Sequence, residues 1–277
     1  MASGAVAVEW RQYGRGWESV LAEVIEESQV TFYVNAQELL TIMATPRDQD
    51  LHALGLLRNE GLIEGMDEVE LVQVSQAGCC VDVWLDHPFT LPRRRIITSG
   101  CGGGVTFTDP SVGIQPLTDR VRIDPQVLFD LFPLLHFPDS LHARARGVHA
   151  AAISDGEKIL ALVEDVGRHN TIDKILGACL VQAIETRGRI LLATGRISSE
   201  MLHKGARMGC PIIASRNSPT SMAVAMAQAW NITLIGYVRQ RSMRVYTHPH
   251  RLISAVDASV LESVSGEFQG ASEAGNP

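Results

Sequence analysis

Residues 159–183, which read ILALVEDVGRHNTIDKILGACLVQA, indicate the fold most clearly. The stretch opens with five consecutive apolar residues, followed by a short polar segment. After that segment, apolar residues recur at the spacing of one helix face, at Ile172, Ile175, Leu176, Cys179, Leu180 and Ala183. A short apolar run followed by an amphipathic pattern predicts a β-strand and the helix that crosses over it.

The same alternation continues towards the C-terminus. Apolar runs at 190–194, 212–214 and 232–238 are separated by segments of helical length. Strands that are apolar throughout are typical of a parallel sheet with helices on both faces. Residues 121–264 are therefore predicted to form a three-layer α/β/α domain.

A helix is expected to open this domain. Asp124 and Pro125 suit the N-cap and first turn of a helix whose apolar side carries Val127, Leu128, Leu131 and Leu135. We therefore place the domain boundary between residues 120 and 121. Residues 265–277 are rich in Gly, Ser, Glu and Gln, and we expect a disordered tail there.

Residues 1–120 are predicted to form a smaller mixed α/β domain. Two aliphatic and β-branched runs flank Asn35 and Ala36, which indicates a hairpin. Leu51, Leu54, Gly55 and Arg58 then recur at helical spacing. Alternating apolar residues predict two further strands, at 69–71 and 81–85.

The composition excludes several classes of protein. The chain has 277 residues, 45% hydrophobic and 20% charged, and 24 Lys and Arg against 31 Asp and Glu give a net charge of −7. This balance argues against a general nucleic-acid binder. No apolar run reaches the roughly 18 residues of a membrane helix, and residues 1–14 lack a secretory signal pattern. Five scattered cysteines suit a reducing compartment, so we expect a cytoplasmic protein without nucleic-acid or membrane partners.

Cys101 is the candidate nucleophile. It lies in the sequence GCGGG at 100–104, where neighbours without side chains allow an exposed and mobile thiol. The arginines at 93–95 could favour its thiolate, the reactive form. The alternative is a small residue in a tight glycine turn. The other four cysteines, Cys79, Cys80, Cys179 and Cys210, are assigned no role.

Ligand-binding loops are expected at the carboxyl ends of the parallel strands, where open α/β sheets bind ligands. Residues 164–170, 195–199 and 215–220 combine cations or hydroxyls with helix starts, which suits phosphate groups. The alternative is simple helix capping, by Asn170 or Thr171, by Ser198 and by Ser218.

The fourth strand runs into a further basic segment. Arg239 and Arg241 alternate there and could bind phosphates or guanine edges through bidentate donors. A charged edge strand that resists aggregation is the alternative interpretation.

Several ordered motifs resemble the FdhD family of formate dehydrogenase accessory sulfurtransferases, over most of residues 26–254. In the first domain these are ATPRD at 44–48, Gly55 and EG at 60–61. In the second domain they are HAAA at 149–152, EDVGRHN at 164–170 with DK at 173–174, SEM at 199–201, PT at 219–220 with AV at 223–224, and VYTHP at 245–249.

The resemblance implies a ubiquitin-like roll followed by a cytidine-deaminase-like domain, and a homodimer. It also implies a sulfur relay from a cysteine desulfurase to the molybdenum or tungsten bis(molybdopterin guanine dinucleotide) cofactor of the formate dehydrogenase catalytic subunit. By motif position, Cys101 matches the cysteine that carries a persulfide. The cofactor segment matches Val238, Arg239, Gln240, Arg241, Ser242 and Met243. We add Arg168 and Arg196 as hypothetical phosphate partners, and we expect no metal site of the protein's own.

One position departs from the family pattern. The family usually has a second cysteine three residues after the first, where this chain has Gly104. A single thiol can hold a persulfide but cannot resolve it into an internal disulfide. A cofactor-binding chaperone that moves no sulfur is therefore the main alternative.

A zinc deaminase is the other alternative that the implied fold suggests. That chemistry needs His-x-Glu and a later Pro-Cys-x-x-Cys. His149 is followed by two alanines, and Cys210 precedes Pro211 with no second cysteine nearby. The zinc ligands and the general acid are therefore missing.

Overall fold

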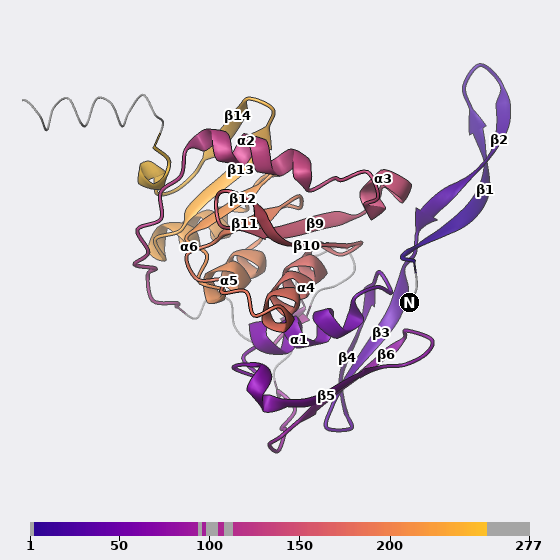
Figure 1. Cartoon of the computed structure of the whole chain (residues 1–277), viewed down its shortest axis with the longest axis horizontal. Coiled ribbons are helices and arrows are strands. Elements are labelled where there is room, and N and C mark those ends of the chain that lie inside the picture. The colour runs from indigo at the N-terminus through magenta and orange to yellow at the C-terminus, as the bar shows by residue number, and fades with distance from the viewer. Residues whose placement is uncertain (1–2, 94–95, 98–104, 108–112, 254–277) are drawn as a thin grey trace, which may run out of the picture.

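The computed structural model describes residues 3–93, 96–97, 105–107 and 113–253 (Figure 1). Cys101, Gly104 and the predicted tail at 265–277 lie outside these residues. The described chain is a mixed α/β protein, as the sequence predicts, with a six-stranded sheet, a four-stranded sheet and two smaller two-stranded pairs.

The six-stranded sheet has the strand order β10-β9-β11-β12-β13-β14. Its central strands β11, β12 and β13 are parallel, whereas β9 and β14 each run antiparallel to their neighbours. The prediction of a parallel sheet is therefore wrong at both sides of the parallel core, and the sheet is mixed. The strands are β9 His149–Ser154, β10 Ile159–Asp165, β11 Ile190–Ala193, β12 Ile212–Ser215, β13 Thr233–Arg239 and β14 Ser242–Val245.

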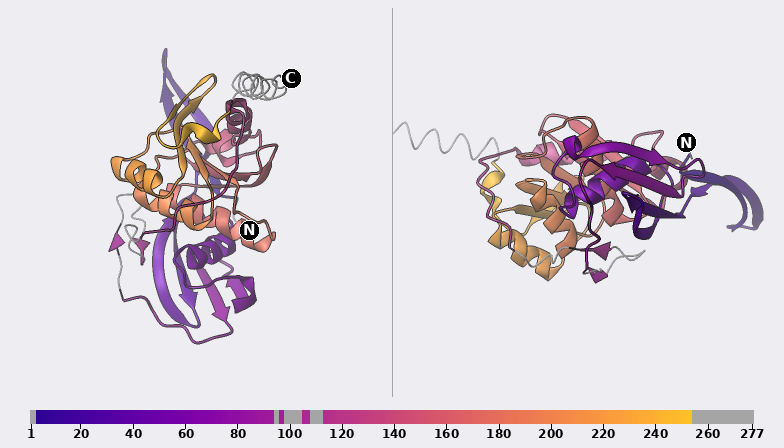
Figure 2. Two further views of the ribbon diagram at one scale, coloured as in Figure 1. Left: turned by 90° about the vertical axis from the view of Figure 1, so that its left-hand side faces the viewer. Right: turned by 90° about the horizontal axis from the view of Figure 1, so that it is seen from below.

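Helices cover both faces of this sheet, which gives three layers (Figures 1 and 2). Leu191 points into the core beneath α4, α5 and α6, whereas its neighbour Leu192 points into the core beneath α2. This alternation follows from the two-residue period of a strand, and it explains why the strands are apolar throughout. The helices are α2 Pro125–Leu134, α4 Arg168–Val181, α5 Ser199–Arg207 and α6 Ser221–Ala229.

Leu117, in the segment before α2, packs with the elements of the six-stranded sheet. Leu117 lies in the core with α6, and its amide nitrogen donates to the Trp230 carbonyl oxygen at 3.0 Å. It precedes the predicted domain boundary at 120 and 121. Asp124 caps α2 as predicted, since its Oδ1 accepts from the Gln126 amide at 2.7 Å.

The four-stranded sheet has the order β4-β3-β6-β5 and packs one face against α1. The predicted hairpin is confirmed, with Asn35 and Ala36 at φ of 47° and 62° in its turn. The elements are β3 Ser28–Val34, β4 Gln37–Ala44, α1 Gln49–Asn59, β5 Val69–Val74 and β6 Cys80–Leu85. Shorter elements are β7 Ile96–Ile97, β8 Val105–Thr106, α3 Leu141–Ala145 and the 3-10 turns Met66–Glu68 and Pro249–Arg251.

The two sheets are joined through a close crossing of α1 and α4 (Figure 1). A methyl group placed on Gly55 of α1 would overlap the carbonyl oxygen of Asp173 in α4. A methyl group on Gly177 of α4 would likewise overlap the carbonyl oxygen of Leu51 in α1. Glycine at both positions therefore lets the two helix backbones touch.

A two-stranded ribbon, β1 Ala5–Tyr13 and β2 Trp17–Ile25, projects from the body (Figures 1 and 2). Opposed residues of an antiparallel pair share a face, and here one face carries Val6, Val8, Trp10, Val20, Ala22 and Val24. Its base packs on α3 and is held by the Arg144 Nε to Glu23 Oε2 hydrogen bond of 2.8 Å. This ribbon was not among the elements expected from the sequence.

Candidate functional site

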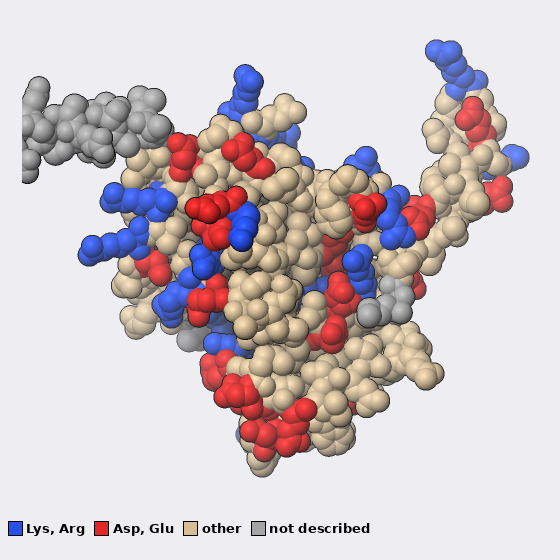
Figure 3. All heavy atoms as spheres, viewed as in Figure 1, with Lys and Arg blue, Asp and Glu red and all other residues tan. Residues whose placement is uncertain are grey.

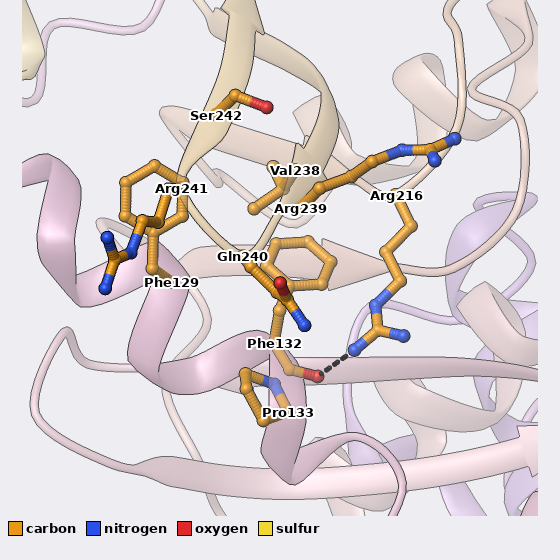
Figure 4. A pocket seen from close by; sticks show the side chains of 9 residues that line it. All are labelled: Phe129, Phe132, Pro133, Arg216, Val238, Arg239, Gln240, Arg241 and Ser242. Atoms are coloured by element: carbon orange, nitrogen blue, oxygen red, sulfur yellow. Dashed lines mark hydrogen bonds between the residues drawn. The ribbon is translucent and has the colours of Figure 1, made fainter.

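A cavity of about 870 Å³ lies between the β13–β14 hairpin and α2 (Figure 4). The hairpin contributes charged and polar side chains, α2 contributes aromatic rings, and the loop after β12 contributes a further arginine. The lining residues are Phe129, Phe132, Pro133, Arg216, Val238, Arg239, Gln240, Arg241 and Ser242.

A bulge in the hairpin positions its arginines. The register between β13 and β14 shifts between Gly236 and Arg239, and Tyr237 adopts a φ of 55°. Bulges bend a strand and re-aim its side chains. The Arg244 guanidinium lies 4.2 Å from the centre of the Tyr237 ring and supports the bend from the second strand. Arg239 and Arg241 are both exposed at the end of this hairpin.

Arg216 closes the opposite side of the cavity. Its Nη2 donates to the Phe132 carbonyl oxygen at 3.0 Å, and its guanidinium carbon lies 6.0 Å from the centre of the Phe132 ring (Figure 4). Partial burial lowers the pKa of Arg216, but a guanidinium stays protonated in proteins. Arg216 is therefore a fixed cation at the cavity wall.

The cavity combines three guanidinium groups with aromatic surface, and among the described residues that line it none carries a carboxylate. Guanidinium groups bind phosphates through paired donors. Aromatic rings and guanidinium planes also stack on flat heterocycles. The arrangement is thus suited to a ligand with an aromatic base and phosphate groups. Figure 3 shows basic side chains projecting around this hairpin, although the whole chain is acidic.

The cavity contains most of the predicted segment. Val238, Arg239, Gln240, Arg241 and Ser242 line it. Met243 does not line it, because the strand alternation turns this side chain towards the core beneath α2. Cys101 lies outside the described residues, so its distance from the cavity stays a prediction.

Sequence reasoning missed four lining residues. Arg216 lies in the loop at 215–220, which the analysis singled out without assigning that arginine. The position of this loop at the carboxyl end of β12, next to β13, was a usable signal. Phe129, Phe132 and Pro133 carried no such signal, because their proximity to β13 depends on how α2 packs across the sheet.

The first predicted phosphate loop, at 164–170, is occupied by internal contacts. α4 begins after Gly167, and Asn170 donates to Asp165 Oδ1 at 2.8 Å and to the Met43 carbonyl oxygen at 2.9 Å. Capping by Asn170 or Thr171 is therefore wrong. The Arg168 side chain is buried and packs over Gly195. Arg196 is exposed, and neither arginine lines the cavity.

The other two helix starts are capped by side chains. Ser198 caps α5 as predicted, with its Oγ accepting from the Met201 amide at 3.4 Å. Thr220, rather than Ser218, caps α6 and accepts from the Ala223 amide at 3.3 Å.

A buried ion pair ties this loop to the four-stranded sheet. Lys174 Nζ lies 2.6 Å from Asp165 Oδ2, and both side chains are inaccessible to solvent. The same ammonium donates to the carbonyl oxygens of Thr45, at 3.2 Å, and Arg47, at 2.6 Å. A buried charge is tolerated only when it is paired and hydrogen-bonded, so these contacts join the two halves rather than hold a ligand.

A second buried cluster surrounds Lys204. Its Nζ donates to Asp173 Oδ1 and Oδ2 at 2.9 and 2.7 Å, and lies 3.6 Å from Glu200 and 3.9 Å from Glu60. Burial opposes the charge of Lys204, but the three carboxylates outweigh it and raise the pKa. Burial also raises the pKa of Asp173 to about 6, although Lys204 opposes this shift. Beside this cluster, burial lowers the pKa of His169 to about 4.

The described residues hold no group of three or more His, Cys, Asp or Glu side chains arranged to bind a metal ion. Cys179 and Cys210 are buried, and burial raises the pKa of Cys179 to about 12. Within the ranges that the structure covers, no helix has both the length and the apolar character needed to span a membrane.

Comparison with known proteins identifies the family. The chain is 34% identical over 254 residues to the sulfur carrier protein FdhD of Bacillus subtilis, a match that covers 90% of this chain and 97% of that protein. It is 32% identical to the sulfur carrier protein FdhD of Staphylococcus haemolyticus, over 82% of this chain and 89% of that one. A crystal structure described as a formate dehydrogenase accessory protein of Desulfotalea psychrophila matches with a TM-score of 0.74 and 26% identity, over 90% of this chain and 99% of that chain. The model of the FdhD/NarQ family matches residues 25–253, and the chain therefore belongs to the FdhD/NarQ family.

Proposed function

We propose that this protein is a sulfur carrier that serves a formate dehydrogenase. The observation that carries the proposal is the cavity at the β13–β14 hairpin, which Arg216, Arg239 and Arg241 line together with aromatic rings of α2. The names of the relatives support it, since both curated proteins cited above are sulfur carrier proteins.

The proposed sulfur donor is the persulfide of a cysteine desulfurase. The Cys101 thiolate attacks the outer sulfur of that persulfide, a new sulfur–sulfur bond forms on Cys101, and the donor leaves as a thiolate. No net oxidation occurs in this exchange. Cys101 has glycine on both sides in the sequence, and glycine permits backbone conformations that other residues rarely adopt, which suits delivery.

The proposed acceptor is the bis(molybdopterin guanine dinucleotide) cofactor of molybdenum or tungsten, bound as cargo. Arg239, Arg241 and Arg216 would hold its phosphates, and Phe129 and Phe132 would contact its flat rings. Transfer to the metal reduces the sulfane sulfur to sulfide. The metal in its reduced state supplies the two electrons, and the Cys101 thiolate is restored.

The remaining features of the proposal come from the family resemblance. They are a cytoplasmic homodimer that meets two partners in turn, a cysteine desulfurase and the catalytic subunit of formate dehydrogenase.

Intact-mass measurement tests the sulfur transfer. The protein is incubated with a cysteine desulfurase and cysteine, with a sample lacking cysteine as the control. We expect the mass of one added sulfur on Cys101, abolished in Cys101→Ala. Tryptic digestion locates the adduct, because Cys101 is the only cysteine between Arg95 and Arg120. An unmodified Cys101 peptide under all donor conditions would overturn the transfer.

A cofactor chaperone without sulfur transfer is the second candidate, and Gly104 is the observation that favours it. It predicts that the cavity binds its ligand while Cys101 stays unmodified. Adduct formation together with ligand binding favours the carrier that we propose.

A further inference from the structure

Cys79 and Cys80 form a thiol pair where the turn after β5 leads into β6. Their sulfur atoms lie 3.8 Å apart. Cys79 is exposed and Cys80 is partly buried. In a regular strand, consecutive side chains point to opposite faces, so the approach of two adjacent sulfur atoms depends on the turn.

Hydrogen bonds define that turn. Ser75 bridges it, with its amide nitrogen donating to the Cys80 carbonyl oxygen at 2.9 Å and its Oγ accepting from the Cys80 amide at 3.1 Å. Gly78 adopts a φ of 67°, and its carbonyl oxygen accepts from the Gln49 side chain of α1 at 3.0 Å. The thiol pair is therefore presented by an anchored turn rather than by a loose loop.

The two thiols differ in character. The Ser75 hydroxyl lies 3.8 Å from the Cys79 sulfur, and this contact and the neighbouring Cys80 thiol lower the pKa of Cys79. Burial raises the pKa of Cys80, and the hydrogen bond between its thiol and the Cys79 thiol adds to this shift. The pair thus combines an exposed thiol whose pKa is lowered with a partly buried thiol whose pKa is raised. A nucleophile and a resolving thiol need this difference.

No other pair of thiols in the described ranges offers this chemistry, because Cys179 and Cys210 are buried. The glycine loop has Gly104 in place of a second cysteine. A dithiol at residues 79 and 80 would restore the resolving step that the loop lacks.

We propose that Cys79 and Cys80 are a second sulfur-accepting site, at which Cys79 takes sulfane sulfur from a protein persulfide and Cys80 releases it as hydrosulfide. The proposal rests on the proposed sulfur-carrier function. In the first step the Cys79 thiolate attacks the outer sulfur of the donor persulfide, and the donor leaves as a thiolate.

In the second step Cys80 attacks the inner sulfur of Cys79. The bond between the two sulfurs of the persulfide breaks, a bond between Cys79 and Cys80 forms, and the outer sulfur leaves with its electron pair and the proton of Cys80 as hydrosulfide. The two thiols supply the electrons, so sulfur departs already reduced to sulfide. A dithiol reductant of the thioredoxin class then restores the pair.

Tryptic mapping after incubation with a cysteine desulfurase and cysteine, without added reductant, tests the proposal. Residues 59–93 contain no internal Lys or Arg before Arg93 and only two cysteines, Cys79 and Cys80, so trypsin separates this pair from Cys101. We expect the wild-type peptide to lose two hydrogens as hydrosulfide is released. Cys80→Ser should retain one added sulfur on Cys79 and release at least about tenfold less hydrosulfide. Cys79→Ser should show neither change.

The outcomes separate this inference from the proposed function. Sulfur on Cys101 with an unmodified 59–93 peptide overturns the inference and leaves the proposed function intact. Sulfur on the 59–93 peptide with an unmodified Cys101 overturns sulfur transfer by Cys101 and supports the inference. Persulfide that accumulates equally in wild type and Cys80→Ser overturns the role of Cys80.

A trivalent arsenical checks the pair without any desulfurase. Phenylarsine oxide bridges two close thiols, so intact mass should show one equivalent on the wild type and none on Cys79→Ser or Cys80→Ser. Unchanged thermal unfolding of both variants shows that they fold. Equal labelling of all three proteins would overturn the thiol pair.

Discussion

At the scale of single residues, the chemistry of the cavity rests on its arginines. Arg239 and Arg241 line the cavity from the hairpin, and Arg216 lines it from the loop after β12, with its guanidinium against Phe132. A hydrogen bond between charged groups contributes about 1.5–3 kcal/mol. Arg239 and Arg241 are exposed, so screening by solvent reduces that contribution for them more than for the partly buried Arg216.

The double variant Arg239→Ala/Arg241→Ala should bind a guanine nucleotide at least about tenfold more weakly by calorimetry, because it loses two phosphate partners. Arg196→Ala is the matched control, since Arg196 is equally exposed but does not line the cavity. Equal affinity of the double variant and the control for the nucleotide would show that the nucleotide does not bind at this cavity.

Residue types and spacing predicted the hairpin arginines but not their neighbours. Alternating arginines after an apolar strand are visible in one sequence. The approach of Phe132 to Arg216 is not, because 84 residues separate the two in the chain. Met243 belongs to the cofactor segment that the family resemblance implies, and its role there stays a prediction; in the structure its side chain packs against the core beneath α2.

At the scale of secondary-structure elements, the parallel core of the sheet was predictable because β11, β12 and β13 are apolar throughout. β9 was missed because its sequence, HAAAIS, is rich in alanine, which has low strand propensity. Its small side chains suit a strand that is buried on both faces between β10 and β11. β1 and β2 escaped prediction because they mix apolar and charged residues and lie outside the compact body.

The crossing of α1 and α4 is the element contact that tolerates least change. Gly55→Ala should lower the free energy of unfolding by about 3 kcal/mol or more, because the added methyl overlaps a backbone carbonyl that cannot rotate away. Gly14→Ala is the matched control, because no atom lies within 4 Å of the added methyl in the ribbon turn. Urea unfolding followed by circular dichroism measures both variants. Equal urea midpoints for Gly55→Ala and Gly14→Ala would show that α1 and α4 can move apart without a loss of stability.

At the scale of the whole molecule, buried charges hold the two sheets together. Lys174 and Lys204 come from α4 and α5, whereas Thr45 and Glu60 come from the N-terminal half. The loop at 164–170 was predicted to be a ligand site because polar residues at a strand end look the same in sequence whether they bind a ligand or contact another part of the chain. Only the position of the N-terminal half, which contacts this loop, shows that the loop forms an interface and not a ligand site.

The interface should make the protein sensitive to acid. Burial lowers the pKa of His169 to about 4 in the folded protein, against an ordinary value of 6.5. Between these two pH values the imidazole is protonated in the unfolded chain but neutral in the folded chain. The contribution of His169 to stability therefore falls as the pH drops from about 6.5 towards 4, whereas Asp173, whose pKa is raised to about 6, contributes in the opposite direction and is present in every variant. His169→Gln should reduce the loss of unfolding free energy between pH 7.5 and 5.0 by about 1–2 kcal/mol.

Urea titrations at the two pH values measure this difference. His250→Gln is the comparison variant: burial and the nearby Arg251 also lower the pKa of His250, but this side chain is exposed on the turn Pro249–Arg251, so we expect a smaller effect of the same sign. His52 is fully buried and its pKa is also depressed, but it is present in every variant and cancels from the comparison. An identical pH dependence in wild type and His169→Gln would mean that the folded protein protonates this imidazole freely.

The ion pairs between the halves also constrain the order of events during synthesis. The ribosome delivers β3, β4, α1, β5 and β6 well before α4 and α5, so Glu60 emerges 144 residues ahead of its buried partner Lys204. At roughly 5–20 residues per second, that interval lasts on the order of 7–30 s. Throughout it, the outer side of α1 has no covering helix from the nascent chain. Chaperone engagement during translation should therefore peak in this interval and end once α5 has left the exit tunnel.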